Sequence, residues 1–177
     1  MSGDLDLSWA TPQLAVGGRF PIEQVERLAR ELGITHVVDV RAECCDDEMV
    51  LRRHGLVLLK LPTQDRCAVS PDMLDEGVRW VGRQLRQGNK VYIHCEYGIG
   101  RSALLALCVL ASFGLTPLEA LSTLKRARWK VSPSPEQLQG FLDWVERHGG
   151  AVPSLGALFE IAYAHLAQGQ VGSGTSG

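Results

Sequence analysis

The chain has 177 residues, which is typical of one domain and long enough to bury a hydrophobic core without disulfide or metal support. Hydrophobic residues make up 45% of it and charged residues 21%, which excludes an intrinsically disordered chain and a fibrous one. The formal net charge of −2 argues against a large basic surface for nucleic acid or anionic membranes, so any phosphate site has to be local.

The cysteines and the first residues indicate the compartment. The five cysteines are an odd number without paired CxxC spacing, so we expect neither a disulfide framework nor a zinc site. The start, MSGDLDLSWATP, carries acids where a secretory signal has a basic start and an apolar core. No apolar run approaches the length of a membrane span. The sequence thus predicts a cytoplasmic protein with no membrane span and no cofactor.

Strands and helices are expected to alternate along the first half of the chain. Residues 13–18 predict a short strand stopped by glycines, and residues 22–33 predict a helix that ends at Gly33. Residues 34–40 are β-branched and largely apolar, as in a strand covered on both faces. The next predicted elements are a helix over 46–55, a strand over 56–62, a helix from a Ser70 cap to about Gln87, and a strand over 90–95.

Only helices are expected after the last strand. Residues 102–113 are apolar nearly all round, which is typical of a helix in the centre of a domain. The other predicted helices cover about 117–129, 135–148 and 154–167. The pattern predicts a single α/β domain with a four- or five-stranded, mainly parallel sheet and helices on both faces. We expect the main domain at 1–150, a helical extension at 151–168 and a flexible Gly/Ser tail at 169–177.

The stretch HCEYGIGRS, residues 94–102, joins the predicted strand to the apolar helix and has the pattern of an anion cradle. Backbone N–H groups of a loop that enters a helix point inward, and the helix dipole adds positive charge. The same field favours the nucleophilic thiolate of Cys95. Arg101 adds a planar guanidinium that can hold two phosphoryl oxygens at once. The pattern therefore predicts a nucleophile beside a phosphate site.

The other loop residues are expected to bind the phosphate or to help the cysteine. Gly98 and Gly100 permit the turns that direct successive amides to one point. Ser102 can donate a hydrogen bond to the Cys95 sulfur and so help the thiolate leave. The predicted substrate-binding residues are Glu96, Tyr97, Gly98, Ile99, Gly100 and Arg101, and no metal ligand is predicted.

Cleavage of a phosphate ester also needs a proton donor for the leaving oxygen and a base for water. Asp65 is the best candidate, because it follows the predicted strand over 56–62. In a parallel sheet that strand and the one before Cys95 end at the same edge, where ligands of open α/β folds bind. Asp72 and Asp75 are weaker candidates, since acids in the first turns of a helix are explained by its dipole.

HCEYGIGRS resembles the HCxxGxxRS/T signature of the cysteine-dependent protein tyrosine phosphatases, and the upstream acid is similar to the small, atypical dual-specificity branch. The order of segments matches over about residues 10–148. The resemblance implies a phosphocysteine mechanism in which Cys95 is the nucleophile, Arg101 binds phosphate and Asp65 is the general acid. It also implies a phosphorylated protein or peptide as substrate, with no nucleic-acid partner.

Several alternatives stay open. The loop lacks the lysines of phosphoinositide phosphatases, and Glu96 and Ile99 argue against a highly charged inositol head group. We therefore expect a protein phosphatase for phosphotyrosine, with phosphoserine and phosphothreonine left open. The same chemistry on a lipid, a nucleotide or an RNA 5′ end, or a phosphate-binding module without turnover, are the alternatives.

Three further predictions concern residues outside the loop. His94 is expected to be a structural hydrogen-bonding residue behind Cys95. A basic cluster is hypothesised to flank the pocket and to favour acidic phosphopeptides; it comprises Lys125, Arg126, Arg128 and Lys130. Cys44, Cys45 and Cys67 are candidate partners for a reversible disulfide with oxidised Cys95, and the sequence does not select among them.

Overall fold

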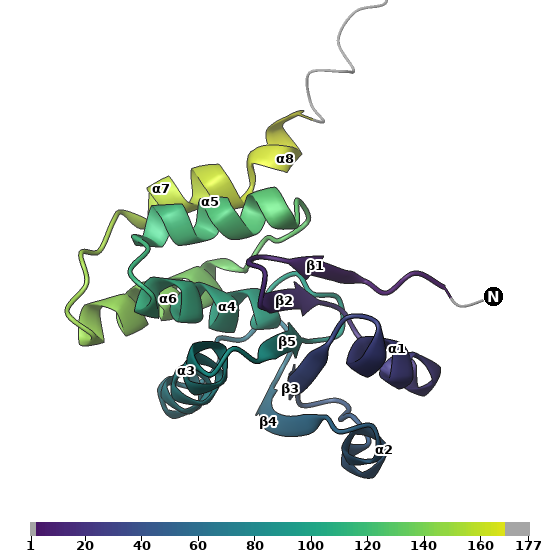
Figure 1. The fold of residues 1–177 in the computed structure, drawn as a ribbon. Helices are drawn as coiled ribbons and strands as arrows, with labels where there is room; N and C mark the ends of the chain where they lie inside the picture. The colour runs from purple at the N-terminus through teal and green to yellow at the C-terminus, as the bar shows by residue number, and fades with distance from the viewer. Residues whose placement is uncertain (1–2, 169–177) are drawn as a thin grey trace, which may run out of the picture.

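A five-stranded sheet forms the centre of the molecule (Figure 1). The computed structural model describes residues 3–168, so the predicted tail at 169–177 lies outside the described residues. In sheet order the strands are β1 (Leu7–Trp9), β2 (Leu14–Gly17), β5 (Lys90–His94), β3 (Ile34–Arg41) and β4 (Val57–Thr63). Within the described residues, β1–β2 is the only antiparallel pair, and the other three pairs are parallel. The predicted mainly parallel sheet is confirmed.

Helices cover both faces of this sheet, as predicted (Figure 1). One face carries η1 (Ile22–Gln24), α1 (Val25–Arg30) and α2 (Glu48–Arg53). On the other face α3 (Pro71–Arg86) and α4 (Arg101–Ser112) contact the strands, while α5 (Pro117–Ala127) and α6 (Pro135–Arg147) pack on α4. Successive residues of a strand point to opposite faces, so β5 contributes to a hydrophobic core on each side of the sheet. Tyr92 packs in the core under α1 and α2, and Ile93 packs in the larger core with α3 and α4.

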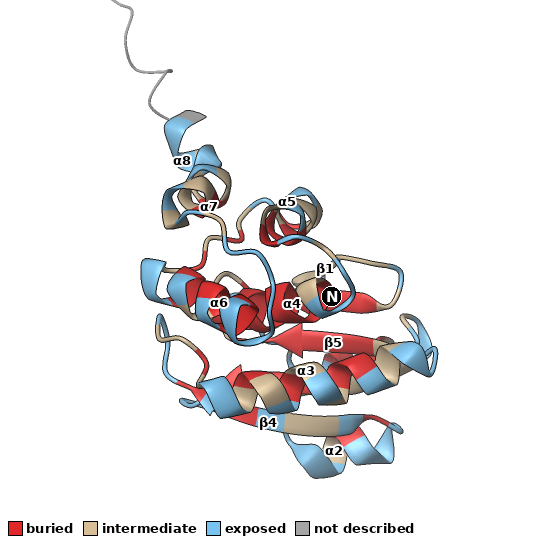
Figure 2. Cartoon of the chain, turned by 90° about the vertical axis from the view of Figure 1, so that its left-hand side faces the viewer, coloured by how far each residue is buried: buried red, intermediate tan, exposed pale blue. Residues whose placement is uncertain are grey.

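Helix α4 is the central helix of the domain, because residues 101–110 are all buried (Figure 2). The prediction of an all-round apolar helix is confirmed. The β3, β4 and β5 strands run parallel, so their carboxyl ends lie at the same edge as the α4 N-terminus. Local signals also act as expected: the Ser70 hydroxyl accepts a hydrogen bond from the Met73 N–H at 3.3 Å, with Pro71 opening α3.

Two elements differ from the sequence prediction. Strand β1 was not predicted, because three residues are too few to show alternation. The predicted helix at 154–167 is broken at Tyr163 into α7 (Leu155–Ala162) and α8 (Ala164–Gln168). Leu158 and Ala162 of α7 are fully buried in the larger core, so the C-terminal segment packs on the rest of the domain. Among residues 3–168, no helix has the length and apolar content needed to cross a bilayer.

Candidate active site

The loop of residues 95–101, called the signature loop from here on, wraps around the sulfur of Cys95. The Gly98 N–H donates to Sγ at 3.3 Å, and the Ser102 hydroxyl lies 3.3 Å from the same sulfur. Gly98 has φ +65°, and a Cβ there would lie 2.3 Å from the carbonyl carbon of Gly17. Glycine is therefore required at this position for both conformation and space. The predicted Cys95–Ser102 contact is present.

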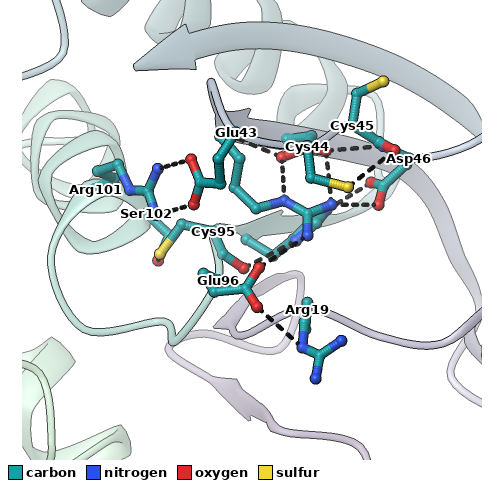
Figure 3. A network of polar contacts seen from close by, with 12 residues as sticks. Arg19, Glu43, Cys44, Cys45, Asp46, Cys95, Glu96, Arg101 and Ser102 are labelled. Carbon is teal, nitrogen blue, oxygen red and sulfur yellow. Dashed lines mark hydrogen bonds and ion pairs between the residues drawn. The ribbon is translucent and has the colours of Figure 1, made fainter. Parts of the chain in front are cut away.

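Arg101 lies beside Cys95, and its guanidinium is held from its outer end (Figure 3). Nη1 and Nη2 each donate to a Glu43 carboxylate oxygen at 2.7 Å, and Nη1 also donates to the Thr63 carbonyl at 2.9 Å. Burial by itself lowers the pKa of Arg101, but the Glu43 bond and the surrounding negative charge raise it overall. In the described chain Nε of Arg101 is buried without a hydrogen-bond partner. One N–H of this guanidinium is therefore left for a ligand.

Sequence reasoning missed Glu43. It follows β3, at the edge of the sheet where β4 and β5 also end, and that position is the signal that could have identified it. Its bond to Arg101 is the main cause that lowers the pKa of this carboxyl to about 2. Glu43 is therefore an anion at neutral pH, and it fixes the direction of the arginine fork.

Asp65 lies at the mouth of the site, in the loop after β4. Its Oδ1 is 3.6 Å from Nη2 of Arg101, and its side chain is 58% exposed. Oδ1 also accepts a hydrogen bond from the backbone N–H of Arg66, at 2.9 Å. The carboxyl thus projects over the arginine from the solvent side, within the same cavity as Cys95. The predicted acid and the predicted nucleophile therefore line one cavity, as expected for residues that follow parallel strands ending at the same edge.

Glu96 differs from the prediction, since it is not among the residues that line the cavity, and its side chain points toward Arg19 (Figure 3). Its carboxylate pairs with Arg19 at 3.0 Å and with Arg41 at 3.1 Å. Its charge is neutralised by these partners, which weakens the sequence argument that Glu96 repels charged head groups. Of the predicted substrate-binding residues, Tyr97, Ile99, Gly100 and Arg101 do line the cavity.

A buried polar network supports the loop from behind. Asp39, Asp46 and His94 place three possible ligand atoms within 4.8 Å of one another. Arg41 donates to Asp39 at 3.0 Å and to Asp46 at 3.1 Å, so its guanidinium supplies the positive charge between these carboxylates. His94 contacts Asp46 through Nε2 at 2.5 Å and the Cys95 carbonyl through Nδ1 at 3.2 Å. Its predicted structural position behind Cys95 agrees with these contacts.

Arg128 corrects the hypothesis of a basic cluster beside the pocket. Its side chain is 3% exposed, and it donates to the carbonyls of Gly98 at 2.7 Å and of Tyr97 at 2.9 Å. Nη2 also donates to Asp6 at 2.9 Å, and Lys130 pairs with Asp6 at 2.8 Å. Lys125 is bonded to backbone carbonyls, which leaves only Arg126 exposed as the sequence suggested. Arg128 thus binds the signature loop and Lys130 binds Asp6, so these residues do not form a charged patch beside the pocket.

These residues enclose a cavity of about 370 Å³ with Cys95 in its lining. Its other walls come from the segment before α6, from the first turn of α6 and from the C-terminal segment. They include Ser132, Gln137, Tyr163, His165 and Leu166. A larger cavity of about 660 Å³ lies at the far end of α4, between Val78, Leu115 and Trp144. We place the site in the smaller of these two cavities, because Cys95 and Arg101 line that one and not the larger one.

All five cysteines are free thiols in the structure. Cys44 and Cys45 are exposed and Cys67 is partly buried. A disulfide partner for oxidised Cys95 stays a prediction.

The chain has a mainly parallel sheet, and at one edge of it a loop from Cys95 to Arg101 leads into a buried helix. These features place the protein in the class of cysteine-dependent protein tyrosine phosphatases. Residues 21–147 match the catalytic domain of the dual specificity phosphatases, and the chain belongs to that family.

Individual relatives differ in their named substrates. The phosphatidylglycerophosphatase and protein-tyrosine phosphatase 1 of Mus musculus is 27% identical over an alignment of 131 residues, and the match covers 69% of this chain and 67% of the mouse protein. The chain spans 35% of the phosphatidylglycerophosphate phosphatase PTPMT1 of Arabidopsis thaliana, at 25% identity. The active form of Tk-PTP superposes with a TM-score of 0.74 at 28% identity, covering 80% of this chain and 97% of Tk-PTP.

Proposed function

We propose that the protein hydrolyses phosphate monoesters through a phosphocysteine intermediate on Cys95, with phosphotyrosine in proteins as the substrate. The observation that carries the proposal is the buried Nε of Arg101, which has no hydrogen-bond partner among the described residues, in a side chain that lines the same cavity as Cys95. A buried N–H of a cation without an acceptor costs free energy, and a phosphoryl oxygen supplies that acceptor. Glu43 occupies the Nη1–Nη2 end, so the Nε–Nη2 edge is the one that takes the phosphate.

In the first step the Cys95 thiolate attacks phosphorus, the S–P bond forms and the bond from phosphorus to the ester oxygen breaks. Asp65 gives its proton to that leaving oxygen. The Gly98 N–H and the Arg101 guanidinium hold the charge of the transferring phosphoryl group in place. Because these donors are fixed before the substrate binds, they need no reorganisation during the reaction.

In the second step water attacks phosphorus and the S–P bond breaks. Asp65, now ionised, takes the proton of the water, so one carboxyl serves as acid and then as base. The electron pair of the S–P bond returns to the sulfur as a thiolate. Ser102, whose hydroxyl lies 3.3 Å from Sγ, donates to that developing thiolate and makes it a better leaving group.

The substrate is inferred from the walls of the cavity. A volume of about 370 Å³ lies within the range of small-ligand sites, and Tyr97, Ile99 and Tyr163 supply aromatic and aliphatic surface near the phosphate position. An aromatic ester such as phosphotyrosine can pack its ring on these side chains. A short serine phosphate offers the walls no comparable apolar surface.

A second candidate is a phospholipid monoester. It is favoured by the names of the relatives, since the mouse protein is described as both a phosphatidylglycerophosphatase and a protein-tyrosine phosphatase. The two substrates share the phosphate chemistry and differ in the group beyond the ester oxygen.

One comparison tests the proposal. The kcat/KM of the wild type is measured on one peptide carrying phosphotyrosine or phosphoserine, and on vesicles containing phosphatidylglycerophosphate, with Cys95→Ser as control. We expect Cys95-dependent turnover, with phosphotyrosine preferred. A preference for the lipid would transfer the proposal to the second candidate, and activity that survives in Cys95→Ser would refute the mechanism.

A further inference from the structure

The C-terminal segment lines the same cavity as Cys95. Tyr163, His165 and Leu166 lie after α7, and each contributes to the cavity wall. The segment is fixed in place because Leu158 and Ala162 of α7 are fully buried against the core. The Tyr163 hydroxyl also donates to the Pro133 carbonyl, at 2.5 Å. A chain segment beyond the matched family region, which ends at residue 147, therefore forms one side of the site.

Lys125 sets the orientation and the tautomer of His165. Its Nζ donates to the carbonyls of Val131 and Ala162, at 2.5 and 2.7 Å, and contacts Nδ1 of His165 at 2.9 Å. An ammonium group can only donate, so Nδ1 of a neutral His165 is the acceptor and Nε2 carries the proton. The ring thus supplies an N–H donor in the wall of the cavity.

The rim of the cavity is aromatic and aliphatic. Tyr97 and Leu166 line the cavity and are each 61% exposed, while Trp129, which lies outside the lining, is 69% exposed. Trp129 packs edge-on against the His165 ring at 5.9 Å, which connects it to the same wall. Large exposed apolar side chains that gather around a site are typical of surfaces that bind a partner.

We infer that residues 163–166 are the specificity-determining wall of the site and select phosphotyrosine peptides whose flanking residues are apolar. The inference rests on the proposed function. His165 donates its Nε2–H to a carbonyl of the peptide backbone next to the phosphotyrosine. Leu166, together with Tyr97, packs on the neighbouring apolar side chain. The acidic preference expected from the sequence is replaced by an apolar one.

A peptide fits this wall better than a membrane surface does. Peripheral binding to anionic bilayers depends on free basic side chains around the apolar ones. Arg128 is buried and Lys130 is paired with Asp6, so neither is free for lipid head groups. Besides Arg101, the cavity lining among the described residues includes one arginine, Arg66, which adjoins the carboxylate of Asp65.

The test uses the full chain with His165→Ala and Leu166→Ala, and with Glu160→Gln as the matched control. Glu160 lies exposed on α7 and is not part of the cavity lining. Substrates are p-nitrophenyl phosphate, two phosphotyrosine peptides that differ only in apolar or acidic flanks, and vesicles containing phosphatidylglycerophosphate. We expect the wild type to prefer the apolar peptide. In both wall variants its KM should rise about fivefold to tenfold, with kcat kept, and the rise should be smaller for p-nitrophenyl phosphate.

Each other outcome overturns the inference. A wild type that prefers acidic flanks, or wall variants that behave like Glu160→Gln, would refute the role of the segment. An equal loss on all substrates would show a structural effect only. Turnover of phosphatidylglycerophosphate vesicles in preference to both peptides would assign the wall to lipid. Failure of the proposed function is distinct, because it would abolish Cys95-dependent hydrolysis of p-nitrophenyl phosphate by the wild type itself.

Discussion

Arg128 holds the outer turn of the signature loop, and its replacement by methionine gives a prediction with a defined size. The change removes four donations from a buried guanidinium, to Gly98, Tyr97, Asp6 and Ser8. Asp6 keeps Lys130 as a partner and the Ser8 hydroxyl can turn, so the main loss is at the two loop carbonyls. At about 1–3 kcal/mol for each buried acceptor left unpaired, we expect the free energy of unfolding to fall by about 3 kcal/mol.

That loss lowers Tm by about 6–12 °C for a chain of this size. Stability alone does not test whether Arg128 positions the loop, so two further quantities are measured well below the Tm of the variant. The Ki of inorganic phosphate should rise about tenfold, and alkylation of Cys95 by iodoacetamide at neutral pH should slow. Both follow because the Gly98 N–H, which faces Sγ at 3.3 Å, is no longer held.

The matched control is Arg126→Met, since Arg126 lies exposed in the last turn of α5, two residues before Arg128. It should leave Tm, Ki and the alkylation rate near their wild-type values. If Arg128→Met lowered Tm but left Ki and the alkylation rate unchanged, the residue would support the fold without positioning the loop. A Tm equal to that of Arg126→Met would refute the hydrogen-bond reasoning altogether.

Three further substitutions test the site. In the wild type, the ionised Glu43 stabilises the fold above pH 4.5, the ordinary pKa of this carboxyl, and this stability is lost as pH falls toward the folded pKa of about 2. Glu43→Gln should remove that contribution, which solvent screening limits to about 1 kcal/mol because Glu43 is 45% exposed. The measurement is the free energy of unfolding in urea from pH 6 to pH 2. An identical pH dependence in both proteins would count against the Glu43–Arg101 pair. Asp65→Asn should slow hydrolysis of an alkyl phosphate by about 10²–10⁴-fold and that of p-nitrophenyl phosphate less, and equal slowing would exclude Asp65 as the acid. With p-nitrophenyl phosphate, Ser102→Ala should lower kcat about 10–100-fold and produce a burst of p-nitrophenol release, because breakdown of the phosphocysteine becomes the slow step. A lower kcat without a burst would place Ser102 in the first step instead.

The part of the site that is contiguous in sequence could be predicted. Cys95, Arg101 and Ser102 lie on one strand–loop–helix unit, so their spacing fixes their geometry. Asp65 could be placed as well, because the carboxyl ends of parallel strands meet at one edge. The order of strands and helices followed from periodicity for the same reason, since each element carries its own pattern.

Residues that reach the site from distant segments could not be predicted. Glu43 and Arg128 resemble ordinary loop and helix-surface charges in the sequence, and only tertiary packing brings them to Arg101 and to the loop carbonyls. Glu96 was assigned to the substrate because it lies within the loop, although its partners Arg19 and Arg41 come from other elements. The break at Tyr163 has no glycine or proline to mark it.

The covalent intermediate on Cys95 is the central claim, and it can be observed directly. Wild type and Ser102→Ala are mixed with p-nitrophenyl phosphate, quenched with denaturant within the first turnover, and examined by mass spectrometry of the peptide that contains Cys95. The account predicts one added phosphoryl group on Cys95, more abundant in Ser102→Ala, and none in Cys95→Ser. Turnover without a phosphoryl group on Cys95, or with one on another residue, would contradict it.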